Sequence, residues 1–137
     1  MSVSKKFIFI ISTAVLMASC SSMATSGTAA GKAQPSIAES SWTLTEQVKG
    51  NTPTLKVEAG RLTGNAGCNT YFGNLTLNTS TGDFKAGELA STKKMCENMS
   101  IEKNFLKMLS EANRYAVNGN TLELYKDNLL LMKFNKN

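Results

Sequence analysis

The chain has 137 residues, of which 42% are apolar, 18% charged and 7% aromatic, enough for one globular domain but not for two. It contains no histidine, which excludes Ser-His-Asp and Cys-His catalytic pairs, His-ligated zinc and His-based pH switches. The formal net charge is +5, but the lysines are scattered without a long run of like charges, so binding to nucleic acid is not expected.

The N-terminus has the pattern of a secretory signal. Lys5 and Lys6 precede an apolar run over residues 7–17, which is shorter than the roughly 20 residues of a permanent membrane helix. The run ends in Leu16-Met17-Ala18-Ser19-Cys20, which resembles the lipobox of bacterial lipoproteins. We therefore expect residues 1–19 to be a lipoprotein signal peptide. The alternative is an ordinary cleaved signal peptide followed by an incidental cysteine.

The lipobox resemblance implies that Cys20 is the lipidated N-terminus of the mature protein. Ser21 follows it, and in similar lipoproteins of enteric-type bacteria a serine there accompanies transport to the outer membrane. We therefore expect a protein that is held in the outer membrane by its acyl chains and faces the periplasm, because several acyl chains suffice for stable anchoring. Residues 20–37 are small and polar without periodicity, and predict a flexible tether.

From residue 38 onward the sequence changes to short segments in which apolar and polar residues alternate. This alternation is typical of half-buried antiparallel strands. The intervening segment 64–73 is rich in glycine and predicts a bulge or a sharp bend. The expected strands of this half cover residues 42–45, 55–58, 61–63, 75–77 and 84–92.

One segment has the period of an amphipathic helix instead, with Asn98 or Ser100 able to cap its start and Asn113 able to stop it. Its buried stripe is expected to consist of Ile101, Phe105, Met108, Leu109 and Ala112. Its solvent side is expected to carry Glu102, Lys103, Lys107 and Glu111.

Three strands are expected to close the domain, with turns at 118–119 and 127–128 between them. They contain residues 115–117, 122–124 and 129–134. The apolar run 129–132 shows no alternation, which predicts that it is buried on both faces or lies inside a barrel.

Cys68 and Cys96 remain once Cys20 is assigned to the lipid. A disulfide between them is the simplest expectation in an oxidising compartment, and two separately buried thiols are the alternative. A metal site is not expected, because neither histidine nor a CxxC motif accompanies them.

The order of these landmarks resembles the META domain, or HslJ-like, family over about residues 38–135. The most specific feature is a Gly-Cys-Asn box followed some two dozen residues later by Thr-x-x-Met-Cys. The positions that match the family motif are Trp42, Gly64, Gly67, Cys68, Asn69, Gly73, Thr92, Met95 and Cys96, ahead of a helix containing Glu102 and Phe105. The resemblance implies an α+β domain over residues 38–137, a small incomplete (cracked) antiparallel β-barrel with one covering helix.

No group of residues indicates catalysis or a cofactor. Cys68 beside Asn69 lacks a base, the acidic residues are scattered, and the glycines do not have the spacing of a phosphate-binding loop. A second set of side chains could line a soft apolar cavity but is expected to be core, because a domain of this size needs its apolar residues for burial. This set comprises Met95, Met99, Met108, Met132, Tyr71, Phe72 and Phe84.

We therefore expect a non-enzymatic, lipid-anchored envelope protein. The resemblance implies a domain that binds or stabilises an outer-membrane component, protein or lipid, in envelope or heat stress. The alternative is a carrier that holds an acyl chain or another small apolar ligand inside the barrel. The carrier requires an interior cavity near the helix and Met95, whereas partner binding requires a filled core and exposed apolar side chains.

Overall fold

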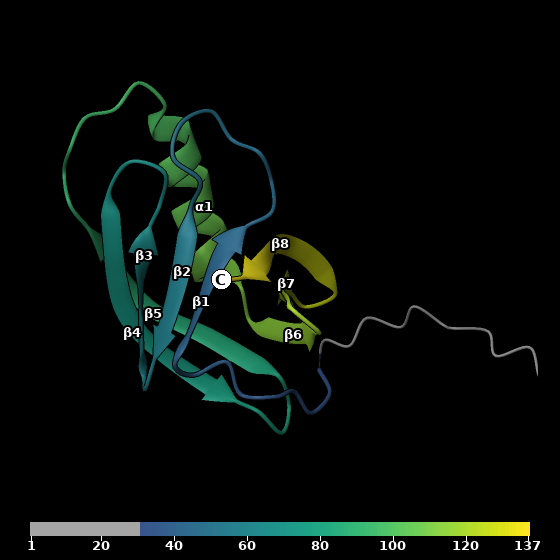
Figure 1. Cartoon of the computed structure of the whole chain (residues 1–137). Helices are drawn as coiled ribbons and strands as arrows, with labels where there is room; N and C mark the ends of the chain where they lie inside the picture. Colours follow the sequence, from purple (N-terminus) through teal and green to yellow (C-terminus); the bar gives the residue numbers. More distant parts are fainter. Residues whose placement is uncertain (1–30) are drawn as a thin grey trace, which may run out of the picture.

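The computed structural model describes residues 31–137, which form a closed antiparallel β-barrel of eight strands with one α-helix (Figure 1). The barrel-like α+β fold expected from the sequence is therefore correct. The elements are β1 (Ser40–Leu44), β2 (Thr54–Glu58), β3 (Arg61–Asn65), β4 (Thr70–Asn78), β5 (Asp83–Ser91), α1 (Met99–Glu111), β6 (Arg114–Asn118), β7 (Thr121–Lys126) and β8 (Leu129–Lys136).

The strands pair in chain order, and β8 returns to pair with β1. The thinnest seam lies between β5 and β6, whose register is the single pair of Asp83 with Arg114. Two backbone hydrogen bonds within two residues of this pair, 3.0 and 2.8 Å long, complete the seam. Helix α1 packs against β5, which is one of the two strands that form this seam.

The glycine-rich segment contains the expected irregularity. The chain turns between β3 and β4, and the register of β4 against β5 shifts between Gly73 and Leu75. The turns expected at 118–119 and 127–128 are also present, with Gly119 and Asp127 in the left-handed region at φ 58° and 55°. The period-2 signal and the turn residues therefore predicted the hairpins correctly.

The interior of the barrel is filled by side chains from the strands and from α1. On β2, Leu55 and Val57 are fully buried while Lys56 between them is exposed, as the alternation predicted. Phe105 of α1 inserts between aromatic rings, with centroids 5.5 Å from Tyr71 and 6.3 Å from Phe134. Such offset aromatic contacts stabilise a core beyond the area that they bury.

Helix α1 buries a face that is rotated from the expected one. Glu102, Phe105 and Leu109 are buried, whereas Ile101 and Met108 are only half-buried. The prediction that Glu102 faces solvent is therefore wrong, because its carboxylate has hydrogen-bond donors inside the protein. Asn98 precedes the helix without a side-chain capping bond.

The run 129–132 is not buried on both faces as predicted. Leu129 and Leu130 are 65% and 46% exposed, and Met132 is buried. The register of β8 against β7 shifts within this run, so its first residues pair beyond the filled part of the barrel. This continuous apolar run therefore does not form a fully buried strand.

The packed domain begins earlier than residue 38. Ile37 is fully buried, and Gln34 donates its backbone N–H to the Thr79 carbonyl oxygen (2.7 Å) and accepts from the Val117 N–H (2.9 Å). Residues 34–37, assigned above to the tether, therefore belong to the folded domain. The predicted signal peptide, Cys20 and tether residues 20–30 lie outside the described residues.

Within residues 31–137, α1 is the longest helix at 13 residues, and no helix there has the length and hydropathy to span a bilayer.

Candidate functional site

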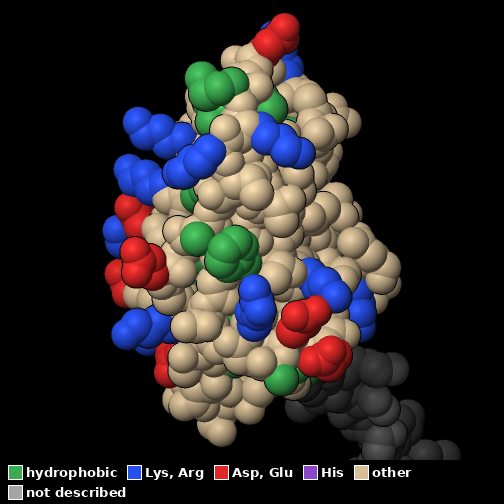
Figure 2. Space-filling model, turned by 90° about the vertical axis from the view of Figure 1, so that its left-hand side faces the viewer, with side chains coloured by type: hydrophobic (Ala, Val, Ile, Leu, Met, Phe, Trp, Pro, Cys, Tyr) green, Lys and Arg blue, Asp and Glu red, His purple; other side chains and the backbone are tan. Residues whose placement is uncertain are grey.

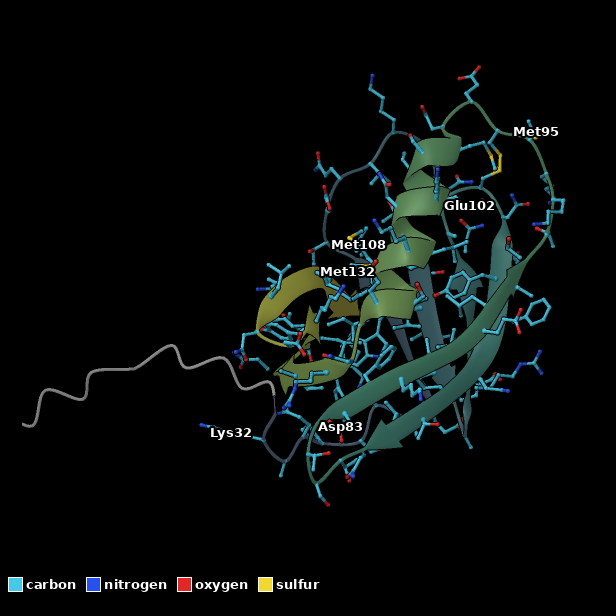
Figure 3. All side chains as sticks on the ribbon, turned by 180° about the vertical axis from the view of Figure 1, so that it is seen from behind. Lys32, Asp83, Met95, Glu102, Met108 and Met132 are labelled. Atoms are coloured by element: carbon cyan, nitrogen blue, oxygen red, sulfur yellow. A yellow bond between two sulfur atoms is a disulfide. The ribbon has the colours of Figure 1, made fainter. Side chains whose placement is uncertain are left out.

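Motif residues from three parts of the chain meet at one end of the barrel (Figure 3). These parts are the β3–β4 turn with Cys68 and Asn69, the loop 92–98 between β5 and α1, and the first turn of α1 with Glu102. In Figure 3 Met95 and Glu102 lie at this end, and Lys32 and Asp83 lie at the other. Asn69 in the β3–β4 turn is 25 residues from Lys94 and 33 from Glu102, so only folding brings this turn to the other two parts, which are contiguous in sequence.

Two glycines of the motif allow the close packing of this end. A Cβ atom on Gly64 would lie 2.1 Å from the Thr54 carbonyl oxygen on β2, so no larger residue fits there. Gly67 has φ 106°, a backbone conformation that side chains oppose, and its N–H donates to the Asn65 Oδ1 atom at 2.7 Å. The third, Gly73, lies away from the turn on β4, opposite Leu89.

Asn69 is the centre of a buried polar network. It is 1% exposed, and its backbone N–H donates to Glu102 Oε2 at 2.9 Å while its Nδ2 atom donates to Oε1 and Oε2 at 3.2 and 3.0 Å. Glu102 is 6% exposed and belongs to the first turn of α1, where the free helix N–H groups favour negative charge. Several charge-assisted hydrogen bonds compensate the desolvation of this carboxylate.

The same asparagine holds the loop that follows β5. Its Oδ1 atom accepts from Thr92 Oγ1 at 2.7 Å and from the Lys94 N–H at 2.8 Å, and its Nδ2 atom donates to the Lys94 carbonyl oxygen at 3.0 Å. We call Asn69, Thr92, Lys94 and Glu102 the Asn69 cluster. All the other members of this cluster lie at least 23 residues from Asn69 in sequence.

A disulfide lies beside the Asn69 cluster. Cys68 and Cys96 are bonded, with their Cα atoms 6.1 Å apart, and the bond connects the β3–β4 turn to the loop 92–98. The loop is thus held by a covalent bond at Cys96 and by backbone hydrogen bonds at Lys94. Cys68 Sγ is engaged in this bond and is not a free thiol.

The remaining motif residues have different surroundings. Trp42 lies on β1, is buried, and donates its Nε1–H to Ser40 Oγ at 2.7 Å, away from the Asn69 cluster. Met95 is 89% exposed, so its expected place in the core is wrong. Lys94 and Cys96 on either side of it are fixed through the backbone and the disulfide, and within residues 31–137 the Met95 side chain itself remains exposed.

The outer face next to this loop also displays an aromatic ring. Phe72 is 43% exposed on β4, contrary to its expected burial, and the Arg61 guanidinium lies 5.7 Å from its ring centroid. Figure 2 shows this side of the molecule, with hydrophobic side chains in the middle and at the upper end, Lys and Arg side chains between and beside them, and Asp and Glu side chains along the edge and in the lower part. We call Arg61, Phe72, Lys93, Lys94 and Met95 the Phe72–Met95 face.

The cavities at this end are small. One of about 120 Å³ is lined by the Asn69 cluster and by Lys93, Met95 and Met99. Another of about 230 Å³ lies beside the disulfide, between Lys49 and Asn98. Both are below the 300–1,000 Å³ that is typical of small-molecule sites.

Buried phenol groups elsewhere in the barrel are hydrogen-bonded in their neutral form. Burial raises the pKa of Tyr71, whose hydroxyl donates to the Thr54 carbonyl oxygen at 2.8 Å. Burial and the Glu123 carboxylate, which accepts from the Tyr125 hydroxyl at 2.6 Å, raise the pKa of Tyr125 to about 12. Among residues 31–137, no group of three or more Cys, Asp or Glu residues is placed to hold a metal ion.

Sequence reasoning named the motif residues but missed the role of Glu102, which is buried. A charged residue next to an apolar stripe usually faces water. One signal for its burial was available: Glu102 lies in the first turn of the helix and belongs to the same family pattern as Asn69. The sequence spacing alone does not show that the side chains of Glu102 and Asn69 meet.

Comparisons with known proteins agree with this architecture. The family model described as META domain matches residues 35–137, which includes the segment before β1 that packs on the barrel. No curated protein matches the chain significantly.

Two solved structures illustrate the similarity in fold. An NMR structure of a protein from Burkholderia xenovorans is 24% identical, with a TM-score of 0.59 over 74% of this chain and 83% of that one. The crystal structure of a DUF4847 family protein from Bacteroides vulgatus is 16% identical, with a TM-score of 0.54 over 74% of this chain and 94% of that one. At these identities the likeness concerns the fold alone.

Proposed function

The chain belongs to the META domain family, and we propose that it is a lipid-anchored envelope protein whose domain binds another component of the outer membrane. The lipobox-like segment ending at Cys20, with Ser21 after it, supports the anchor and the location. The association with envelope or heat stress is part of the proposal and rests on the family resemblance.

The observation that carries the binding proposal is the rigid display of Met95. Asn69 binds the backbone of Lys94 through both its N–H and its carbonyl oxygen, and Cys96 is cross-linked to the β3–β4 turn. A fixed loop loses little conformational freedom when it binds, so an exposed apolar side chain on it contributes more to affinity. Phe72 extends the same face.

The charges around this face favour a partner of a particular chemistry. The Arg61 guanidinium lies over Phe72, and Lys93 and Lys94 directly precede Met95. None of these three cations forms a salt bridge in the described part of the chain, and Glu58 is the register partner of Arg61 on the neighbouring strand. The face therefore suits an acidic surface with an apolar recess, because opposite charge steers association and apolar contact supplies the affinity.

The filled barrel supports binding at the surface over the carrier alternative. Tyr71, Phe105 and Phe134 occupy the interior where an acyl chain would lie. An apolar pocket between α1 and the β1–β2 loop, next to Met108, has a volume of only about 160 Å³. The larger groove, of about 360 Å³, lies over β1–β3, and its lining includes side chains outside the core, such as Ser41, Lys56 and Thr63.

A carrier would need the barrel to open. The seam between β5 and β6, with its single register pair, is the place where the incomplete barrel implied by the resemblance would be found. We propose that this seam stays closed while the domain binds its partner.

We also propose that the domain is not an enzyme. The Cys68 sulfur is engaged in a disulfide and is not available as a thiolate nucleophile. The carboxylate of Glu102 is occupied by hydrogen bonds from Asn69, and the hydroxyls of Tyr71 and Tyr125 donate to fixed acceptors. These groups are engaged within the fold, and the cavities that Cys68 and Glu102 line are small.

The anchor is tested by metabolic labelling with a radioactive fatty acid, followed by separation of inner and outer membranes. We expect label on the wild-type protein in the outer-membrane fraction and none on Cys20→Ser. A Cys68→Ser/Cys96→Ser variant is the control and should keep its label. Labelling of Cys20→Ser, or an unlabelled wild type, contradicts the anchor.

Partner binding is tested in cells with a photoreactive amino acid in place of Met95, compared with Lys85, which is exposed farther along β5. We expect a discrete adduct of defined mass from position 95 and none from position 85. Phe72→Ser should reduce the yield of that adduct, whereas Thr76→Ser, exposed on the same strand, should not. Equal cross-linking from both positions contradicts a specific binding face.

A further inference from the structure

We propose that the β7–β8 turn, through Leu129 and Leu130, is the surface by which the domain rests on the lipid bilayer that holds its anchor. This inference rests on the proposed lipid anchor at Cys20 and adds an orientation to it. The β7–β8 turn is separate from the Phe72–Met95 face and plays no part in the binding proposed above.

The turn presents its leucines on a rigid support. Asp127 has φ 55°, and the pair Asn113–Asp127 forms two reciprocal hydrogen bonds: Asn113 Nδ2 donates to Asp127 Oδ1 at 2.9 Å, and the Asp127 N–H donates to Asn113 Oδ1 at 2.7 Å. Leu129 and Leu130 follow after Asn128 and are 65% and 46% exposed. Two neighbouring exposed leucines on a braced turn are unfavourable in water unless something apolar covers them.

The folded chain begins close to this turn. The Arg114 guanidinium is packed against Gly31, the first described residue. Arg114 pairs with Tyr125 on β7, and Tyr125 pairs with Leu130 on β8. Adjacent strands are about 4.8 Å apart, so Leu130 lies about two strand spacings, roughly 10 Å, from the strand that touches Gly31.

The length of chain before Gly31 limits the distance from the membrane. Cys20 and Gly31 are about eleven residues apart, which at 3.3–3.6 Å per residue spans at most about 40 Å. A compact domain of roughly 100 residues has a radius of gyration of about 13 Å and is therefore itself about 35 Å across. The anchor thus keeps the end of the domain that contains Gly31 near the bilayer at a high local concentration.

The size of the leucine pair favours a bilayer over a second protein chain as its occupant. A stable protein interface needs roughly 800 Å² and 20–30 residues on each partner, far more than two leucines supply. A bilayer requires no shape complementarity, and interfacial apolar side chains need to enter it by only about 5–10 Å. The nearby Lys126 and Lys133 are paired with Glu111 and Glu123, so apolar contact and not charge drives this docking.

This orientation points the Phe72–Met95 face away from the anchoring bilayer. Lys32, one residue from the start of the described chain, and Met95 lie at opposite ends of the molecule in Figure 3. With the β7–β8 turn on the lipid, Met95 is directed into the periplasm, where the periplasmic part of an outer-membrane component can reach it.

The test uses the full acylated protein in vesicles of phosphatidylethanolamine and phosphatidylglycerol. Leu130→Trp introduces a fluorescent probe at the turn, Leu129→Trp is an independent second probe, and Met95→Trp is the control at the opposite end. Native Trp42 is buried and contributes the same background to each variant. Vesicles whose acyl chains carry bromine near the headgroup or near the methyl end report contact with lipid and its depth.

We expect a blue shift and quenching for Leu130→Trp and Leu129→Trp, stronger with bromine near the headgroup, and neither effect for Met95→Trp. Quenching at position 95, or an unquenched probe at both leucine positions in protein that floats with the vesicles, overturns the docking inference alone. A blue shift that depends on protein concentration and not on brominated lipid also overturns it and indicates self-association. Protein that lacks acyl chains and fails to float with the vesicles overturns the anchor and the docking together.

Discussion

Replacing Glu102 by alanine tests the most important buried interaction of the domain. The substitution removes the acceptor of the Asn69 backbone N–H and of one Nδ2 hydrogen, while Nδ2 keeps the Lys94 carbonyl oxygen. One buried donor left without a partner costs about 1–3 kcal/mol, and losing a hydrogen bond to a charged acceptor costs about 1.5–3 kcal/mol. We therefore expect Glu102→Ala to lower the free energy of unfolding by about 3–5 kcal/mol.

This loss is large compared with the 5–15 kcal/mol that stabilises a typical domain, and corresponds to a decrease in Tm of about 12–25 °C. The assay is a urea titration followed by the fluorescence of Trp42, which is the single tryptophan and is buried. Glu102→Gln keeps an oxygen for the Asn69 N–H but turns a donor toward Nδ2, so we expect an intermediate loss of about 1–2 kcal/mol.

Lys103→Ala is the matched control, because Lys103 is the exposed neighbour on the same helix and its replacement should change stability by less than about 0.5 kcal/mol. If Glu102→Ala is no more destabilising than Lys103→Ala, the buried carboxylate does not hold the two segments together and the reasoning is refuted. A double-mutant cycle with Asn69→Ala measures the coupling directly, and strictly additive losses would contradict the contact.

Three further predictions concern the disulfide, the core and a buried phenol. Cys68→Ser/Cys96→Ser should lose about 3–4 kcal/mol, because the bond closes a separation of 28 residues; an intact mass that does not rise by about 2 Da when the wild type is reduced would disprove the bond. Phe105→Ala should lose about 3–5 kcal/mol in the same urea titration, and a loss below about 1 kcal/mol would contradict its packing between Tyr71 and Phe134. Because the pKa of Tyr125 is raised to about 12, unfolding releases its proton above pH 10, so stability should fall as pH rises from 10 toward 12; urea titrations should show a smaller decrease for Tyr125→Phe, and an equal decrease would disprove this role.

The hairpins could be predicted from sequence because their signals are local. The alternation in β2 and the turn residues at 118–119 and 127–128 are read from a few neighbouring positions, and the structure contains the corresponding strands and turns. A period of two specifies which side chains share a face, and an antiparallel pair needs only a short turn to form. The closure of the barrel between β1 and β8 needed the tertiary structure, because that pairing joins the two ends of the domain.

The candidate site could be predicted only as a set of residues. The motif grouped Asn69, Thr92 and Cys96 in one family pattern. It did not indicate which of these residues donate hydrogen bonds or to which partners. The Asn69–Glu102 contact spans 33 residues, and the burial of a carboxylate depends on whether donors from elsewhere reach it. A helical wheel carries no information about such donors, which is why Glu102 was placed in solvent.

The exposed apolar side chains could not be predicted from the sequence either. Leu129 and Leu130 belong to an apolar run and Met95 to a family motif, and both observations favoured burial. Hydropathy expresses a side chain's preference, whereas exposure depends on where the barrel ends and what remains to cover the surface. By itself the sequence determined the family, the hairpins and the residues of the motif, because these depend on local order along the chain. The tertiary structure decided which polar groups are buried together and which apolar groups remain in water, because both depend on contacts between distant segments.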